Sequence, residues 1–184
     1  MRHGMNPLFE NWPTLADRLP YVALGEFPTP IIRLERLGRD IGLDQLYVKN
    51  DGLSGRVFGG NKIRKLEFTL GQALRVGAKE VMTFGAAGSN HALATAVCAR
   101  QVGLRSISLL TPQPNARYVQ RNLLMSYHCG AELHHYPNRR LRALGARLQL
   151  LRHRLLTGRY PLVIPPGGSS PLGVMGFVNA AFEL

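Results

Sequence analysis

A regular alternation of helical and extended patterns from residue 61 onward is the feature that most limits what this chain can fold into. Short apolar runs typical of buried strands lie at 81–86, 106–112, 131–137 and 161–168. Apolar residues spaced by three and four predict helices at 61–77, 89–103, 116–130, 138–157 and 170–184. Because helices and strands alternate along the chain, we predict an α/β fold, an open parallel sheet with helices on both faces.

The region before residue 58 shows no such alternation and is punctuated by prolines. The stretch TPIIRLERLGRDIG (29–42) carries Ile31, Leu34 and Leu37 at a spacing of three, which predicts a short amphipathic helix. The stretch LYVKND (46–51) predicts a strand.

Two glycine-containing turns follow strands and lead into helices, GAAGSNHA (85–92) and PPGGSSPLG (165–173). In open parallel sheets, ligands bind beyond the carboxyl ends of the strands, so both turns are candidates for one ligand site. Free N–H groups and the positive end of the helix dipole suit a carboxylate or a phosphate there. The glycine spacing is wrong for a dinucleotide motif or a P-loop. An ordinary capped helix explains the first turn equally well.

A third glycine turn, GGNK (59–62), places a lysine in the first turn of a helix. Asn61 can cap this helix, but a cation is modestly unfavourable at a helix start. We expect the pKa of Lys62 to be lowered, which favours the neutral amine that a nucleophile requires. A solvated surface lysine is the simpler alternative.

Three segments together resemble a known family: FGGNKIRKLEF (58–68), FGAAGSNHALATA (84–96) and VIPPGGSSPLGVMGFVNAAFEL (163–184). They are similar to the pyridoxal-phosphate enzymes that include D-cysteine desulfhydrase and 1-aminocyclopropane-1-carboxylate deaminase, which have the tryptophan-synthase-β-like (type II) fold. The resemblance implies a pyridoxal 5'-phosphate cofactor and a lyase or deaminase that acts on a small amino acid.

The resemblance also implies roles for five residues. Lys62 corresponds to the catalytic lysine that forms a Schiff base with the cofactor, and Asn90 to the asparagine that hydrogen-bonds the pyridine 3-oxygen. Ser89, Asn90 and His91 correspond to the loop that holds the substrate carboxylate, and in deaminase-type members the serine at Ser89 also touches the reacting atoms. Lys65 either supports the charge of the cofactor or is a solvated lysine.

The chain departs from the family in two respects. Asn50-Asp51-Gly52 stands where the family has two acids, and family members are markedly longer. We therefore expect a truncated chain with an incomplete second domain: 1–57 as the first part of the large domain, 58–163 as the smaller α/β domain, and 164–184 as the return into the large domain. A homo-oligomer, or a partner chain that completes the site, would fit this expectation, and a non-catalytic remnant is the alternative.

The net charge of +12 permits a second function class, nucleic-acid binding. Arg140, Arg147 and Arg154 form a stripe with a spacing of seven on the predicted helix 138–157. This helix also carries leucines at spacings of three and four, namely Leu141, Leu144, Leu148, Leu151 and Leu155. Aromatic residues do not interleave with the basic ones, so we expect a solvated arginine face away from the leucines, and no nucleic-acid partner.

The rest of the sequence bears on the location of the protein, its cysteines and metal binding. There is no apolar run of transmembrane length and no secretory signal, so we expect a cytoplasmic protein without a membrane partner. Cys98 and Cys129 lie far apart in the sequence and are expected to be reduced. The histidines do not form a metal-site pattern, and we expect no metal.

Overall fold

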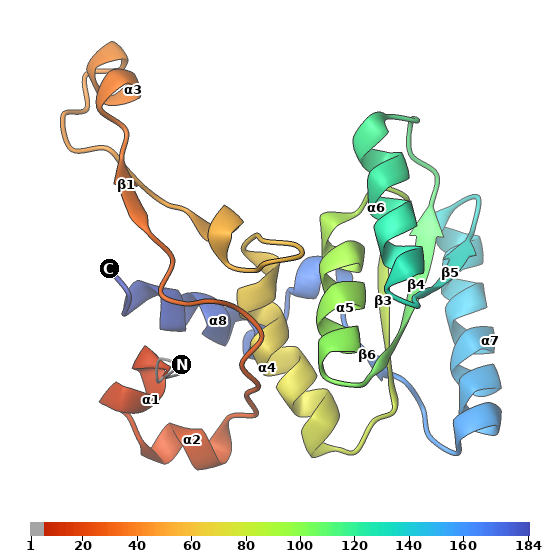
Figure 1. Ribbon diagram of the computed structural model, residues 1–184. Helices are drawn as coiled ribbons and strands as arrows, with labels where there is room; N and C mark the ends of the chain where they lie inside the picture. Colours follow the sequence, from red (N-terminus) through yellow and green to blue (C-terminus); the bar gives the residue numbers. More distant parts are fainter. Residues whose placement is uncertain (1–5) are drawn as a thin grey trace.

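The central element of the fold is a four-stranded parallel sheet in the order β5-β4-β3-β6. A computed structural model describes residues 6–184 (Figure 1). The strands of the sheet are β3 (Glu80–Ala86), β4 (Arg105–Thr111), β5 (Glu132–His135) and β6 (Leu162–Val163). All four coincide with the predicted apolar runs, and every neighbouring pair is parallel, which confirms the predicted α/β class.

Helices cover both faces of this sheet. Val81 packs in one apolar cluster with side chains of α4 (Lys62–Arg75) and α5 (Asn90–Gln101). Its neighbour Met82 packs in a second cluster with α7 (Arg139–Thr157). Successive side chains of a strand point to opposite faces, so the two clusters lie on opposite sides of the sheet, as predicted.

The connections follow the predicted sequence of elements. The helix α6 (Arg117–His128) joins β4 to β5 and packs against α5. Gly77 follows α4 with a φ of 65° and Gly158 caps α7 with a φ of 78°, a left-handed conformation that glycine adopts without strain.

The described residues before 58 form α1 (Pro7–Asn11), α2 (Thr14–Arg18), β1 (Ile31–Arg33), α3 (Glu35–Asp40), β2 (Tyr47–Lys49) and the 3-10 turn η1 (Asp51–Leu53). The part with β1 and α3 extends from the α/β unit as a thin arm, whereas α1 and α2 lie beside the rest of the molecule (Figure 1). The predicted strand at 46–51 is present as β2.

The predicted helix at 29–42 is wrong in its first part. Residues 31–33 form a strand that pairs antiparallel with β2, and only Glu35–Asp40 is helical. Ile31 and Ile32 are β-branched, and pairing with β2 satisfies their backbone groups, which outweighs the helical spacing of the apolar residues.

The last helix, α8 (Pro171–Ala181), follows the 3-10 turn η2 (Pro166–Gly168) and packs against α4. Gly176 lies so close to the backbone of Arg64 that a Cβ at this position would overlap it. The helix ends at Ala181, so the predicted helix to residue 184 is too long. Its buried residues are Gly173, Gly176 and Asn179. Val174 and Phe177 remain partly exposed.

The arginine stripe of α7 is exposed as expected, but its leucines are exposed too. The side of α7 that faces the sheet carries Gly145, Ala146, His153 and a single half-buried leucine, Leu150. The expectation that only the arginines of this helix are solvated is thus wrong. No helix among residues 6–184 is both long enough and apolar enough to span a membrane.

Candidate active site

The loop between β3 and α5 forms the N-terminus of a helix at the carboxyl end of the central strand. Ser89 is the N-cap residue, and its Oγ accepts a hydrogen bond of 3.2 Å from the backbone N–H of Ala92. A Cβ on Gly85 would crowd the Ser89 side chain, so the glycine allows the loop to fold back tightly. The loop therefore presents the free N–H groups and the positive dipole end of α5.

His91 lies in the first turn of α5 and is 3% exposed. Neither ring nitrogen makes a hydrogen bond of normal geometry with a described residue, although the backbone of Pro165 lies near enough to act on the ring. Burial, and after it the charges of Lys62 and Lys65, lower the pKa of His91 to about 4, so its ring is neutral at pH 7. A buried imidazole at a helix N-terminus that has no partner among residues 6–184 is available to bind a ligand.

Lys62 begins α4, and its Nζ donates a hydrogen bond of 3.1 Å to Asn61 Oδ1. Burial, and then the ammonium of Lys65, lower the pKa of Lys62 below its usual value. This is the predicted direction, although the causes are burial and a like charge. Asn61 stands at the N-cap position, as predicted, but its side chain makes no cap hydrogen bond.

Lys65 connects α4 to the second glycine turn. It is only 9% exposed, so the alternative of a solvated lysine is wrong. Its Nζ donates to the carbonyl oxygen of Gly167 at 3.2 Å and to Ser169 Oγ at 3.1 Å. A Cβ added to Gly168 would meet both His91 and Lys65, so the two predicted turns meet at one edge of the sheet.

Asn90 is held by a residue that sequence reasoning missed. Asn122 of α6 is 1% exposed, and its Nδ2 donates to Asn90 Oδ1 at 2.8 Å and to the carbonyl oxygen of Gly88 at 2.9 Å. The oxygen of Asn90 is therefore engaged, and its Nδ2 is the group left to donate to a ligand. In the sequence, the only indication of this role was that Asn122 is a polar residue in the middle of a helix with apolar periodicity.

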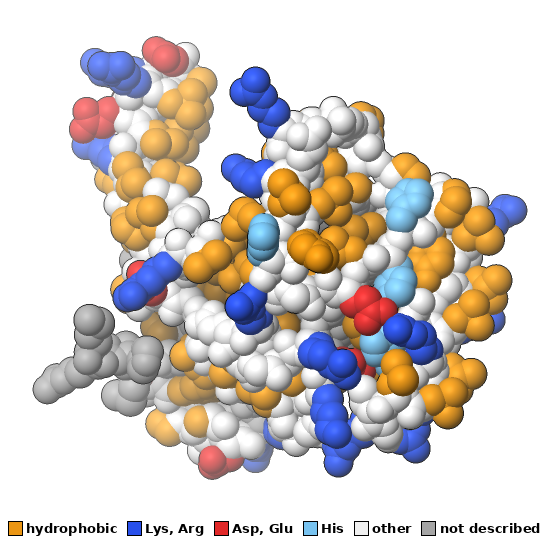
Figure 2. Space-filling view, turned by 45° about the vertical axis from the view of Figure 1, so that its right-hand side comes forward, with side chains coloured by type: hydrophobic (Ala, Val, Ile, Leu, Met, Phe, Trp, Pro, Cys, Tyr) orange, Lys and Arg blue, Asp and Glu red, His pale blue; other side chains and the backbone are white. Residues whose placement is uncertain are grey.

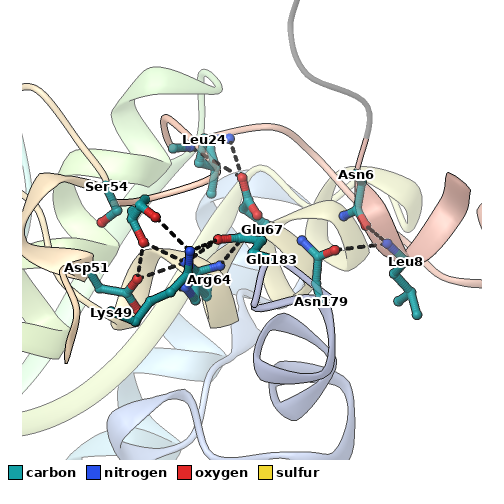
Figure 3. Close-up of polar contacts among 12 residues, drawn as sticks. Asn6, Leu8, Leu24, Lys49, Asp51, Ser54, Arg64, Glu67, Asn179 and Glu183 are labelled. Atoms are coloured by element: carbon teal, nitrogen blue, oxygen red, sulfur yellow. Dashed lines mark hydrogen bonds and ion pairs between the residues drawn. The ribbon is translucent and has the colours of Figure 1, made fainter. Parts of the chain in front are cut away.

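A buried ionic cluster surrounds Arg64 of α4 (Figure 3). Arg64 is 1% exposed and donates to both oxygens of Asp51, at 2.8 and 2.9 Å, and of Glu183, at 2.7 and 2.9 Å. Lys49 forms a further ion pair with Glu183 at 2.8 Å.

Burial alone would raise the pKa values of Asp51 and Glu183. The hydrogen bonds from Arg64 outweigh it and hold both pKa values below their usual range. Asp51 is the acid that remains in the Asn50-Asp51-Gly52 segment, and it pairs with Arg64 across 13 residues. Nothing in the sequence distinguishes Arg64 from an exposed arginine.

The structure brings together Lys62, Lys65 and His91 at the edge of the sheet where α5 begins, and it leaves Asn90 exposed there. The combined charge suits a small anionic ligand, and the lowered pKa of Lys62 suits an amine nucleophile. Within residues 6–184, no group of three or more His, Cys, Asp or Glu side chains is arranged to hold a metal ion.

Comparison with known proteins identifies what this arrangement resembles. A model of the pyridoxal-phosphate dependent enzyme family matches residues 22–184. A Pyrococcus abyssi protein that bears the name of a 1-aminocyclopropane-1-carboxylate deaminase is 39% identical over 171 residues, which are 92% of this chain and 51% of the relative. D-cysteine desulfhydrase from Salmonella paratyphi B is 37% identical over 176 residues, covering 91% of this chain and 52% of the relative.

A solved structure agrees with these relatives. The crystal structure of a homologue of 1-aminocyclopropane-1-carboxylate (ACC) deaminase superimposes with a TM-score of 0.79 at 40% identity, over 92% of this chain and 51% of that one. The chain thus spans about half the length of the curated relatives that it matches.

Proposed function

This chain belongs to the family of pyridoxal-phosphate dependent enzymes, and from that premise we propose that Lys62 holds the cofactor and that the protein is a lyase or deaminase of a small amino acid. The observation that carries the proposal is the unpartnered, neutral His91 beside two lysines at the N-terminus of α5.

The residues present fit the cofactor. Lys62 has a lowered pKa, so more of its amine is neutral near pH 7 and available to bond the aldehyde of the cofactor. The Nδ2 of Asn90 is free to donate to the ring oxygen of the cofactor, because Asn122 occupies its Oδ1. When bound, pyridoxal phosphate supplies an electron sink for bonds at the α-carbon of an amino acid.

The start of α5 is the part of the site that we assign to the substrate carboxylate. Ser89 uses its oxygen to cap the helix, which leaves its O–H to donate, and His91 offers a ring N–H with no other partner. With the positive end of the helix dipole, these groups orient a carboxylate. We assign proton movement at the α-carbon to Lys62 Nζ.

The substrate class that we propose is a small α-amino acid of the kind named by the relatives, D-cysteine or 1-aminocyclopropane-1-carboxylate. Both offer a single carboxylate and a small side group.

We further propose that residues 1–57 and 164–184 belong to one domain and residues 58–163 to another. Support comes from contacts that join the two ends of the chain. The backbone N–H of Leu8 donates to Asn179 Oδ1 at 3.0 Å, and Glu183 pairs with Lys49 at 2.8 Å.

The test is covalent trapping on the chain itself. The purified protein is mixed with pyridoxal phosphate, reduced with borohydride and digested, and the labelled lysine is located by mass spectrometry. We expect one label, on Lys62, that is absent in Lys62→Ala and retained in Lys79→Ala, which removes an exposed lysine. Equal labelling of all four lysines would contradict the proposal.

A second measurement tests the substrate class. D-cysteine or 1-aminocyclopropane-1-carboxylate, added before borohydride, should lower the label on Lys62 because an amino substrate displaces the lysine. Lactate, which has a carboxylate and no amine, serves as the control. Protection by lactate as strong as that by the amino acids would argue against an amino-acid substrate.

A further inference from the structure

The outward side of α7 carries an uncovered row of leucines. Their exposed fractions are 46% for Leu141, 55% for Leu144, 60% for Leu148, 52% for Leu151 and 77% for Leu155. Figure 2, which turns the α7 side of the molecule forward, shows hydrophobic side chains along its right-hand edge. A contiguous apolar surface of this kind in a folded protein marks a site of interaction.

The leucine row cannot turn inward, because the opposite side of α7 is anchored to the sheet. A Cβ on Gly145 would overlap the ring of Tyr136, so the helix backbone approaches the sheet closely there. On the same side, His153 is buried and its Nδ1 contacts both carboxylate oxygens of Glu80 at 3.0 Å. These contacts set the rotation of α7 about its axis.

The spacing of the leucines is that of a coiled-coil seam. The intervals from Leu141 to Leu155 are three, four, three and four residues. This places three leucines at a positions and two at d positions over two heptads. An a/d stripe is the surface that another helix fills knob into hole, and Leu156, which is 67% exposed, widens the apolar surface at the C-terminal end of α7.

The charges beside the leucines determine what kind of helix can bind. Residues 139–157 contain six arginines and no acidic residue. Arg140, Arg147 and Arg154 occupy the position next to each a leucine, and none of them forms an ion pair with another described residue. A second copy of α7 would bring two arginine rows together, which opposes self-pairing.

We propose that α7 is a docking surface for an acidic amphipathic helix of a different protein. The partner helix carries apolar residues at its own a and d positions and Glu or Asp beside them. The apolar residues of the partner cover the leucine row on α7. Its carboxylates neutralise Arg140, Arg147 and Arg154. The surface is separate from Lys62 and His91, so the inference does not depend on the proposed catalysis.

A designed peptide provides the probe. It has three heptads with Leu at a and d and Glu at e and g, where like charges discourage self-association, and it carries a fluorescent label. Titration with the full chain should give saturable 1:1 binding by fluorescence anisotropy. The triple variant Leu144→Gln, Leu148→Gln, Leu151→Gln should bind at least tenfold more weakly, and Leu124→Gln, an exposed leucine of α6, should bind like the unaltered chain.

A charge-reversal variant tests the arginines independently of the leucines. Arg140→Glu with Arg147→Glu should weaken binding of the Glu peptide at least tenfold and favour a matched peptide with Lys at e and g. Because all these positions are exposed, thermal unfolding should be unchanged, and this is checked for each variant.

Four results would overturn the proposal. Unaltered binding by the leucine variant would show that the row is not used. Equal binding of the Lys peptide by the unaltered chain would remove the charge argument. A dimer in sedimentation that the leucine variant abolishes would identify a second copy as the occupant. Leucine-dependent binding to phosphatidylserine vesicles without peptide binding would identify a membrane surface.

Discussion

The helices α4 and α7 have the same apolar periodicity and opposite surroundings. Ile63, Leu66, Leu70 and Ala73 of α4 are at most 2% exposed, whereas the five leucines of the row on α7 are at least 46% exposed. Apolar residues spaced by three and four therefore predicted both helices correctly. They did not tell which of the two apolar faces the rest of the chain would cover.

The difference lies in what packs around each helix. α4 lies between α5 and α8, so even its polar residues Arg64 and Glu67 are buried. α7 packs against the sheet on one side only, through Gly145, Ala146, Leu150 and His153. Three predictions test this contrast, in order of decreasing effect.

Replacing Arg64 by Met should cause the largest loss of stability. The substitution leaves the carboxylates of Glu183 and Asp51 without their main partner, and breaking a buried ion pair costs about 3–5 kcal/mol. The free energy of unfolding from urea titration measures the loss. Arg147→Met on α7 is the matched control and should change it by less than about 0.5 kcal/mol. Equal effects of the two substitutions would contradict the buried cluster.

Truncating one leucine in each helix tests the apolar faces directly. Leu66→Ala empties a fully buried site and should cost about 2–5 kcal/mol. Leu148→Ala on α7 should stay within about 0.5 kcal/mol of the unaltered chain, because its side chain is 60% exposed. Both are measured by urea unfolding. A loss of several kcal/mol from Leu148→Ala would mean that the leucine row is covered.

The smallest effect is a pH dependence that belongs to α4, since α7 has no acidic residue. Burial raises the pKa of Glu67 to about 7, against an ordinary value of 4.5. Below pH 4.5 the carboxyl is protonated in both states. Between 4.5 and 7 only the unfolded chain loses the proton, so the stability that this group contributes falls as pH rises.

We expect this contribution to be about 1–3 kcal/mol. It is measured as the difference between the unaltered chain and Glu67→Gln in urea unfolding at pH 5 and pH 7.5. The difference cancels the opposing contribution of His91, whose pKa is lowered to about 4. If the free energy of unfolding changed equally with pH in the two proteins, Glu67 would be ionised in both the folded and the unfolded state from pH 5 to 7.5, which would contradict the prediction.

The parts of the candidate site that neighbouring residues form could be predicted from the sequence, and the parts that distant residues form could not. The glycine turns, the cap at Ser89 and the lysine at the start of α4 are encoded by neighbouring residues, so their positions could be predicted. Asn122, which holds Asn90, comes from a helix 32 residues away, and no local pattern links the two.

The sequence by itself determined the order of the elements, the parallel sheet and the turns that carry Lys62, Ser89 and His91, because local backbone preferences and strand periodicity decide these. Tertiary structure alone decided that Arg64 and Lys65 are buried, that Ile31 pairs in a strand, and that the leucine row of α7 faces outward. The physical reason is that burial depends on which surfaces meet. Close packing of Gly145 against Tyr136 and of Gly176 against Arg64 decides which surfaces of α7 and α8 are covered. The spacing of apolar residues in the sequence does not indicate where such close packing occurs.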